Sequence, residues 1–188
     1  MTGKYSLEDL IADLTGITSS GAAPEQIILW AKPLLARFVS NTDCIAPQYK
    51  RRGTSSYGRY MLHRAPLFNI TSVVWGPGDT AKAHNHQTWG LVGVVENELQ
   101  ETRFRRLDDG SKEDFADLEL VAVNHNTAGM VSSLLAPNDD IHAMLNVTAR
   151  NTVEVHIYGK DLANLQRLQF DVAEKRVKHF ASPRYDNC

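Results

Sequence analysis

The chain is poor in cysteine, has no long apolar run and carries little net charge. Only Cys44 and Cys188 occur in 188 residues, so a structural disulfide is not expected and a reducing cytoplasm fits best. No segment approaches the roughly 20 apolar residues that span a bilayer, and the acidic, amphipathic N-terminus lacks the apolar core of a signal peptide. With a net charge of −2 and no long basic run, the composition argues against nucleic acid and membranes as partners.

The length fits a single folded domain, which can bury roughly two-thirds of the surface of its unfolded chain. The sequence contains no internal repeat, linker or low-complexity tract. We therefore predict one domain over residues 1–188, with an N-terminal helical region at 1–50, a β-rich core at 55–160 and a closing segment at 161–188. The sequence leaves both a monomer and a homo-oligomer open.

Two helices are predicted before the core. Ser6 can cap a helix over residues 7–14, whose first turn is acidic. A second helix is predicted over residues 24–39, where apolar residues recur near helical spacing and Pro33 is expected to kink or interrupt it. We expect both helices to cover the core rather than to take part in chemistry.

From Leu67 onward the pattern becomes that of β-strands separated by turn residues. The strand-like segments are 67–76, 82–99, 101–107, 118–125, 129–135, 141–147 and 152–159. Many short strands at this spacing predict a mainly β sandwich or barrel. The segment 161–177 is compatible with either a strand pair or a helix.

The stretch GPGDTAKAHNHQTWG holds the most informative residues of the chain, His84 and His86. Side chains two apart on a strand point to the same face, so both rings can reach one metal ion. Imidazole suits zinc, copper, iron and nickel, so the pair does not select the metal. On a surface strand such a pair can also be two solvated polar residues, but Gly78 before it and His142 downstream favour a metal site.

These residues resemble the two motifs of the cupin superfamily. The first motif, a glycine, five residues and His-x-His, is carried by Gly78, His84 and His86. The second, Pro-x-Gly-x-x-His-x-x-x-Asn, is carried by Pro137, His142 and Asn146. Asp139 stands in place of the glycine, and residues 89–91 lack the glutamate ligand of many cupins. The resemblance implies a double-stranded β-helix, or jelly-roll barrel, with N-terminal helices packed against it and a site of three neutral histidines.

Residues 50–170 also look like the thiol dioxygenases, the group of cysteine and 3-mercaptopropionate dioxygenases. The resemblance is carried by Tyr57-Gly58-Arg59, the HNHQTWG segment and His156-Ile157-Tyr158-Gly159. It implies ferrous iron held by His84, His86 and His142. It also implies that Arg59 anchors the substrate carboxylate, and that His156 and Tyr158 lie beside the iron.

The chain departs from that family at two points. Glu154 replaces the serine of a Ser-x-His-x-Tyr segment, so the relay through His156 cannot be identical. Neither Cys44 nor Cys188 matches the cysteine that is crosslinked to the tyrosine in the animal enzymes. We therefore expect any activity to work without a crosslink.

The implied chemistry suits this set of residues. Three histidines add no ligand charge, so Fe(II) keeps its full charge and favours an anionic thiolate. Arg59 can hold a carboxylate with two parallel hydrogen bonds, and Tyr158 can donate one to bound oxygen or sulfur. Dioxygen would then oxidise the sulfur of a small thiol to a sulfinate. The alternatives are that Arg59 lies on the surface and that His156 and Tyr158 are core residues.

Arg167 allows a more specific prediction of the substrate. In the 3-mercaptopropionate branch of the family, the carboxylate is met by an arginine nine residues after the tyrosine, and Tyr158 plus nine is Arg167. If Arg59 and Arg167 both face the cavity, a thiol with two carboxylates, of the mercaptosuccinate kind, would satisfy both. Cysteine and 3-mercaptopropionate remain alternative substrates, and Arg167 could instead be redundant or lie on the surface.

Two other classes of protein remain open from the sequence. One is another metal-dependent cupin enzyme, such as a diketone dioxygenase or an isomerase, and the other is a cupin that binds without catalysis. Three further histidines lack the spacing of metal ligands, namely His63, His125 and His179. Glutamates after the first motif are expected to be solvated, namely Glu96, Glu98 and Glu101.

Overall fold

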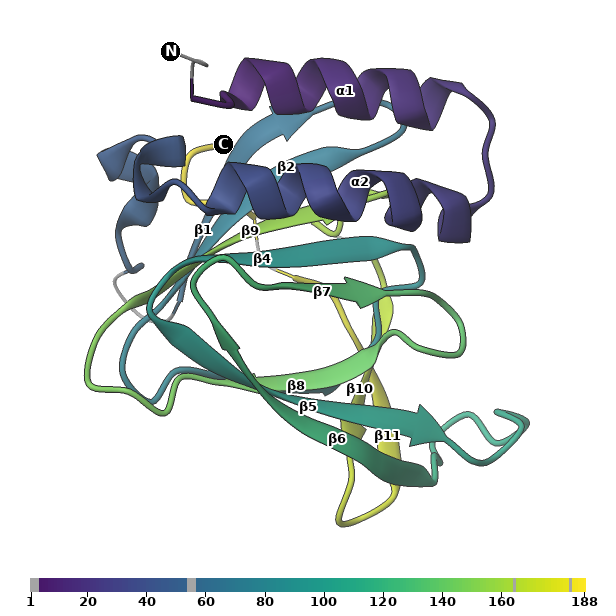
Figure 1. Ribbon diagram of the computed structural model, residues 1–188. Helices are drawn as coiled ribbons and strands as arrows, with labels where there is room; N and C mark the ends of the chain where they lie inside the picture. Colours follow the sequence, from purple (N-terminus) through teal and green to yellow (C-terminus); the bar gives the residue numbers. More distant parts are fainter. Residues whose placement is uncertain (1–3, 54–56, 164, 183) are drawn as a thin grey trace.

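The computed structural model describes residues 4–53, 57–163, 165–182 and 184–188. Two antiparallel β-sheets stack on each other, and two helices lie over the outer face of one sheet (Figure 1). The five-stranded sheet runs in the order β1 (Gly58–Arg64), β2 (Asn69–Trp75), β9 (Thr152–Tyr158), β4 (Gly90–Glu96), β7 (Val131–Leu134). The six-stranded sheet runs in the order β11 (Arg176–Phe180), β10 (Arg167–Asp171), β3 (Thr80–His84), β8 (Ile141–Leu145), β5 (Glu98–Arg106), β6 (Leu118–Thr127). The predicted mainly β fold, with N-terminal helices packed against a barrel of two sheets, is confirmed.

Helix α1 (Leu7–Ser19) begins where the sequence predicts and extends further. The Ser6 side chain accepts a hydrogen bond from the backbone N–H of Asp9, whose carboxylate accepts one from the N–H of Ser6. This reciprocal pair satisfies two backbone donors that a helix N-terminus otherwise leaves open. Leu10 and Leu14 are fully buried on the face toward the molecule, so the helix is held by packing as well as by its cap.

Helix α2 (Pro24–Val39) continues through Pro33, and the expected interruption is wrong. A proline inside a helix removes one backbone hydrogen bond, which would have gone to the carbonyl of Leu29. Both Leu29 and Pro33 lie on the solvent side, where water can satisfy that carbonyl. Tertiary packing of the opposite face, including the fully buried Leu35 and Phe38, outweighs the lost bond.

The alternation of β9 divides the interior into two parts. Val153, Val155 and Ile157 belong to the apolar core shared with the two helices. The alternate residues Glu154, His156 and Tyr158 point to the opposite face of the strand, between the two sheets. One strand therefore contributes to the helix-facing core and to the polar interior of the barrel.

Several strand predictions need correction. The predicted segment 82–99 is divided into β3, a loop, β4 and the first residues of β5, because the chain leaves the six-stranded sheet after β3, joins the five-stranded sheet as β4 and then returns. Strand β1 was missing from the predicted strands, and 161–177 resolves into the pair β10 and β11 rather than a helix. Two short 3₁₀ helices, η1 (Thr42–Cys44) and η2 (Pro47–Lys50), connect α2 to the barrel.

The C-terminal residues lie against β1. The backbone N–H of Asp186 donates to the carbonyl of Arg59 at 2.7 Å, and the Asp186 carboxylate accepts from the N–H of Arg59 at 2.7 Å. Asn187 makes a similar pair of bonds with the backbone of Met61. The end of the chain thus extends the hydrogen bonding of the edge strand that carries Arg59.

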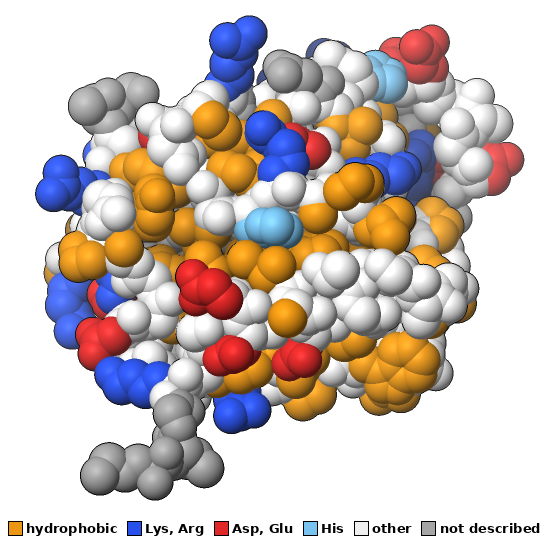
Figure 2. Space-filling model, turned by 90° about the horizontal axis from the view of Figure 1, so that it is seen from above, with side chains coloured by type: hydrophobic (Ala, Val, Ile, Leu, Met, Phe, Trp, Pro, Cys, Tyr) orange, Lys and Arg blue, Asp and Glu red, His pale blue; other side chains and the backbone are white. Residues whose placement is uncertain are grey.

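The helical side of the molecule presents a mixed surface, with apolar side chains among charges of both signs (Figure 2). Leu29 and Trp30 on α2 are large apolar residues with exposed side chains, at 65% and 45%. Among the described residues, no helix combines the length and the apolar character needed to cross a bilayer.

Candidate metal centre and substrate cavity

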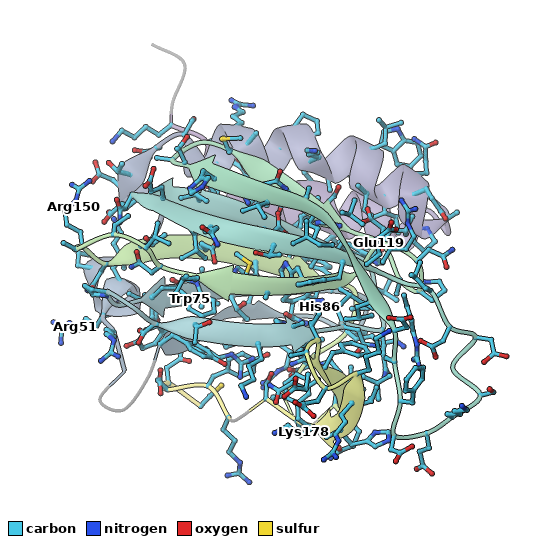
Figure 3. The ribbon with its side chains drawn as sticks, turned by 90° about the horizontal axis from the view of Figure 1, so that it is seen from below. Arg51, Trp75, His86, Glu119, Arg150 and Lys178 are labelled. Atoms are coloured by element: carbon cyan, nitrogen blue, oxygen red, sulfur yellow. The ribbon has the colours of Figure 1, made fainter. Side chains whose placement is uncertain are left out.

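A cavity of about 360 Å³ lies between the two sheets. Trp75 and His86 lie in the interior between the strands when the barrel is viewed from the side away from the helices, whereas Arg51 and Arg150 lie at its edge (Figure 3). The polar side chains on the cavity wall are Tyr57, Arg59, Thr71, Thr80, Lys82, His84, His86, His142, His156, Tyr158, Arg167, Gln169 and Ser182. No carboxylate is among the described residues that line it.

The three histidines of the two motifs meet at this cavity. One ring nitrogen from each of His84, His86 and His142 lies within 4.8 Å of the other two. His84 is the last residue of β3 and pairs with His142 on β8, whereas His86 lies in the loop beyond the strand. The expectation that the pair shares one strand is therefore wrong for His86, although both rings reach the same point.

Hydrogen bonds to the backbone orient the first two rings. The Nδ1 of His84 lies 2.8 Å from the carbonyl of Lys82, and the Nδ1 of His86 lies 3.0 Å from the carbonyl of Asp140. The Asp140 carboxylate also accepts from the N–H groups of His86 and Gln87, each at 2.9 Å. These bonds fix the loop that carries His86, which has no strand pairing to hold it. The sequence did not indicate that Asp140 supports this loop.

The third ring is oriented by a buried carboxylate. The Nδ1 of His142 lies 2.8 Å from Oε1 of the fully buried Glu101. Arg103 donates to the same oxygen, and the Asn126 side chain donates to Oε2. Burial alone would raise the pKa of Glu101, but its bonds to His142 and Asn126 and the charge of Arg103 outweigh burial and lower it to about 2. The prediction that Glu101 is solvated is wrong. The alternation with buried Leu99 on the same strand was the signal that could have found it.

These residues fit a metal ion. Because each Nδ1 is engaged elsewhere, the three Nε2 atoms are left to face one another. Burial, and then the mutual proximity of the rings, holds the pKa of His84 and of His86 well below the usual range, so both imidazoles are neutral as a metal ligand must be. Three imidazole nitrogens suit first-row metals such as iron and zinc, and leave room for other ligands.

A second polar chain lies along β9 beside the histidines. The Nδ1 of His156 lies 2.9 Å from the Tyr158 hydroxyl, and its Nε2 lies 3.0 Å from Oε2 of Glu154. Trp75 donates its indole N–H to the same Oε2 at 2.7 Å. Tyr158 stacks on the ring of His86 with 5.2 Å between centroids, and its burial raises its pKa above the usual range. These side-chain contacts therefore connect the metal-ligand candidate His86 to the buried carboxylate of Glu154.

Arg59 lies on β1, the edge strand of the sheet that contains β9, and it lines the same cavity. Only 9% of the residue is exposed, and its guanidinium lies 4.7 Å from the centre of the Tyr185 ring. The hydroxyl of Tyr185 donates to Asp161 at 2.7 Å. The C-terminal segment thus fixes both the backbone and the side chain of Arg59, a contact that spacing in the sequence could not indicate.

Arg167, the first residue of β10, lines the same cavity and is 2% exposed. It donates to the carbonyl of Asn85 at 2.9 Å and to the Ser182 hydroxyl, and it lies over the ring of Phe180. Its buried Nε has no hydrogen-bond partner among the described residues. Burial lowers the pKa of Arg167, but the ordinary pKa of arginine is high enough to keep the guanidinium charged.

The remaining motif residues support the turns at the two ends of the β3–β8 pair. Gly78 has φ of +76°, which favours glycine, and its N–H donates to the carbonyl of Asn146 at 3.0 Å. The Asn146 side chain donates to the carbonyl of Trp75 at 3.0 Å. Asp139, which replaces the motif glycine, accepts from Arg103 at 2.7 Å. These residues hold the hairpins that present the histidines.

A two-sheet barrel with three inward histidines defines a cupin with a candidate metal centre. Residues 27–171 match the family described as cysteine dioxygenase type I, and the chain belongs to that family. The family and the three-histidine site support a metal-dependent cupin enzyme.

Similar solved structures include a protein from Thermus thermophilus, at 14% identity and a TM-score of 0.45 over 60% of this chain and 90% of that one. A double-stranded β-helix protein of Klebsiella pneumoniae is 14% identical, with a TM-score of 0.46 over 63% and 81% of the two chains. A cupin superfamily protein of Desulfitobacterium hafniense is 14% identical, with a TM-score of 0.42 over 64% and 87%.

Proposed function

We propose that this protein is an Fe(II)-dependent thiol dioxygenase that converts a small thiol carboxylate to its sulfinate. The overall change is R–SH plus O₂ to R–SO₂H, so both oxygen atoms end on the sulfur and no other reductant is needed. The observation that carries the proposal is the convergence of three histidine nitrogens and two buried arginines on one cavity.

The metal would be held by His84, His86 and His142. When bound, iron would supply the reaction with dioxygen and favour the thiolate form of the substrate. Burial keeps His84 and His86 neutral. The carbonyls of Lys82 and Asp140 and the carboxylate of Glu101 orient the three rings. Such outer contacts fix the tautomer and raise the basicity of a ligand.

The two arginines favour a substrate with two carboxylates. Arg59 and Arg167 repel each other across the cavity, and the buried Nε of Arg167 has no hydrogen-bond partner among the described residues. An anion bound between the two guanidiniums would offset that repulsion. A planar guanidinium can hold a carboxylate through two parallel hydrogen bonds. We therefore propose that a thiol of the mercaptosuccinate kind is preferred over cysteine and 3-mercaptopropionate, each of which has one carboxylate.

The rest of the cavity would hold the substrate and exclude water. Apolar side chains line the wall between the polar groups, namely Val73, Trp75, Met144, Leu162 and Phe180. Tyr158 would bond to the reacting part of the substrate, because it stacks on His86 at the metal centre. These apolar side chains keep water away, which strengthens the hydrogen bonds and ionic contacts in the cavity.

Metal analysis combined with oxygen uptake on three thiols tests this proposal. The purified protein should contain iron and consume oxygen with mercaptosuccinate, cysteine and 3-mercaptopropionate, with the highest kcat/KM for mercaptosuccinate. A sulfinate product, identified by mass spectrometry, should account for the oxygen consumed. Stoichiometric iron without oxygen uptake on any thiol would favour another cupin enzyme, and a protein unable to bind metal would favour a binding module.

A further inference from the structure

We infer that Tyr185 is a positioning residue whose ring holds the Arg59 guanidinium where the second carboxylate of the substrate binds. Tyr185 thereby sets the preference for thiols with two carboxylates. This inference rests on the proposed function and adds to it a residue that selects the substrate. Tyr185 lies beyond residues 27–171, the part of the chain that matches the family, so its role follows from contacts in this chain.

The Tyr185 ring is buried and contacts a side chain of the cavity wall. Tyr185 is 5% exposed, and the centre of its ring lies 4.7 Å from the guanidinium of Arg59, which lines the cavity. The face of an aromatic ring attracts a cation, most strongly where water is excluded. A ring carries no net charge, so it holds a guanidinium without neutralising it. This contact therefore leaves the positive charge of Arg59 able to attract a carboxylate.

A polar network fixes the position of this ring. The Tyr185 hydroxyl donates to Oδ1 of Asp161 at 2.7 Å, and Oδ2 of Asp161 accepts from Nε of Arg64 at 2.9 Å. The Arg64 guanidinium also lies 5.8 Å from the centre of the same ring. The hydroxyl is therefore tied to a carboxylate, and that carboxylate is tied to β1 through Arg64. The ring cannot swing away from Arg59 without losing this bond.

The backbone next to Tyr185 is aligned with Arg59 as well. The N–H of Asp186 donates to the Arg59 carbonyl at 2.7 Å, and the Asp186 carboxylate accepts from the Arg59 N–H at 2.7 Å. Tyr185 is the preceding residue, so this pair of hydrogen bonds fixes where its ring begins relative to Arg59. Groups that bind a substrate need such support, because a displacement of about 1 Å can cost about 100-fold in rate.

The second arginine of the cavity has an aromatic support of its own. The Arg167 guanidinium lies 4.6 Å from the centre of the Phe180 ring and donates to the Ser182 hydroxyl. Tyr185 takes no part in these contacts, so its loss should disturb Arg59 and spare Arg167. A thiol with one carboxylate can use Arg167 alone, whereas a dicarboxylate uses both guanidiniums. Tyr185 therefore distinguishes the two kinds of thiol.

Binding of succinate, which has both carboxylates of mercaptosuccinate but no thiol, tests the inference without turnover. In calorimetric titrations of the purified protein, Tyr185→Leu should weaken succinate binding by about 10-fold, because it removes a buried cation–π contact. Tyr185→Phe keeps the ring and should bind succinate nearly as the wild type does. Asn187→Ala is the matched control, because it removes two hydrogen bonds between the same C-terminal segment and Met61 but leaves the ring in place. Equal weakening in Tyr185→Leu and Asn187→Ala, or no succinate binding to the wild type, overturns the inference.

Fluorination of the ring separates its attraction for Arg59 from its contribution to packing. Phenylalanines with one, two or three ring fluorines at position 185 keep the shape of the ring and weaken its attraction for a cation. Succinate binding should weaken with each added fluorine, while the thermal stability stays nearly constant. An affinity that does not change along the series would show that Tyr185 acts only through packing, and the inference would be wrong.

Steady-state kinetics on two thiols tests the selection of the substrate. Tyr185→Leu should raise KM for mercaptosuccinate by about 10-fold, with little change in kcat, because the lost contact acts on binding rather than on the chemical step. KM for 3-mercaptopropionate should stay unchanged. An equal rise of both KM values would contradict the inference. Succinate binding that depends on Tyr185, without oxygen uptake on any thiol, would instead refute the proposed function alone.

Discussion

The Nδ1 of His142 and Oε1 of Glu101 lie 2.8 Å apart at the centre of the barrel, joining a candidate metal ligand to a fully buried carboxylate. Glu101 is itself held by Arg103 and Asn126. The orientation of His142 therefore depends on a side chain from the neighbouring strand β5, which does not contact the metal position itself. Such outer partners typically contribute strongly to metal affinity.

Glu101→Gln should weaken metal binding by about 10- to 100-fold, because the neutral amide orients His142 less strongly. Competition with a chromogenic chelator measures this affinity. Glu119→Gln on the exposed strand β6 is the matched control and should bind metal as the wild type does. Unchanged affinity in Glu101→Gln would show that the contact is only structural.

His142→Ala should lose the metal and the oxygen uptake while the barrel stays folded, since a site with three protein ligands cannot easily spare one. Metal content and circular dichroism check the two parts of this prediction. His125→Ala, an exposed histidine on β6, should change neither. Stoichiometric iron and normal oxygen uptake in His142→Ala would remove His142 from the site.

Arg167→Ala and Arg59→Ala should each raise KM for mercaptosuccinate, because each removes a buried ionic contact with a carboxylate. The loss of kcat/KM should correspond to about 2–5 kcal/mol of binding free energy. Steady-state oxygen uptake on the three thiols measures this. Arg176→Ala, at an exposed arginine on β11, should leave all three values unchanged. A preference for cysteine together with no effect of Arg167→Ala would contradict the two-arginine substrate.

Gly90→Ala should impair turnover as well as stability. A Cβ at Gly90 would lie 2.7 Å from Cδ1 of Tyr158, so the ring must move. Gly93→Ala on the same strand is the control, because its Cβ would meet Val39 at 2.9 Å and Leu35 at 3.1 Å on the helix side. Each change should cost about 1–3 kcal/mol of unfolding free energy.

Denaturation and kinetics together separate the two glycine variants. At a temperature where both proteins are folded, only Gly90→Ala should show a reduced kcat. Equal kcat values in the two variants would indicate that the position of Tyr158 does not matter for turnover.

Cys44 should react slowly with thiol reagents in the folded protein. Burial raises its pKa to about 11, with the charge of Lys50 opposing the shift. At pH 8 such a thiol is only about one-thousandth thiolate, and the thiolate is the reactive form. Labelling should therefore speed up as the pH rises toward 11, whereas exposed Cys188 should label readily at pH 8. Rapid labelling of both cysteines at pH 8 in the folded protein would contradict this prediction.

The sequence alone determined features that depend on near neighbours in the chain. The Ser6 cap depends on contacts within one turn of helix, and it formed as predicted. The shared face of His156 and Tyr158 follows from the period of a strand. The resemblance of the two histidine motifs to cupins implied the barrel and the three-histidine site, and the three rings meet in the structure.

Only the tertiary structure decided what meets across the barrel. Glu101 reaches His142 because β5 pairs with β8, and Asp140 supports His86 across the gap between the end of β3 and the start of β8. Arg59 and Arg167 lie more than 100 residues apart in the chain, and they face one cavity because β1 and β10 belong to different sheets that stack on each other. Such contacts depend on which strands pair and how the sheets stack, and burial of the whole apolar interior sets that arrangement rather than any local pattern of residues.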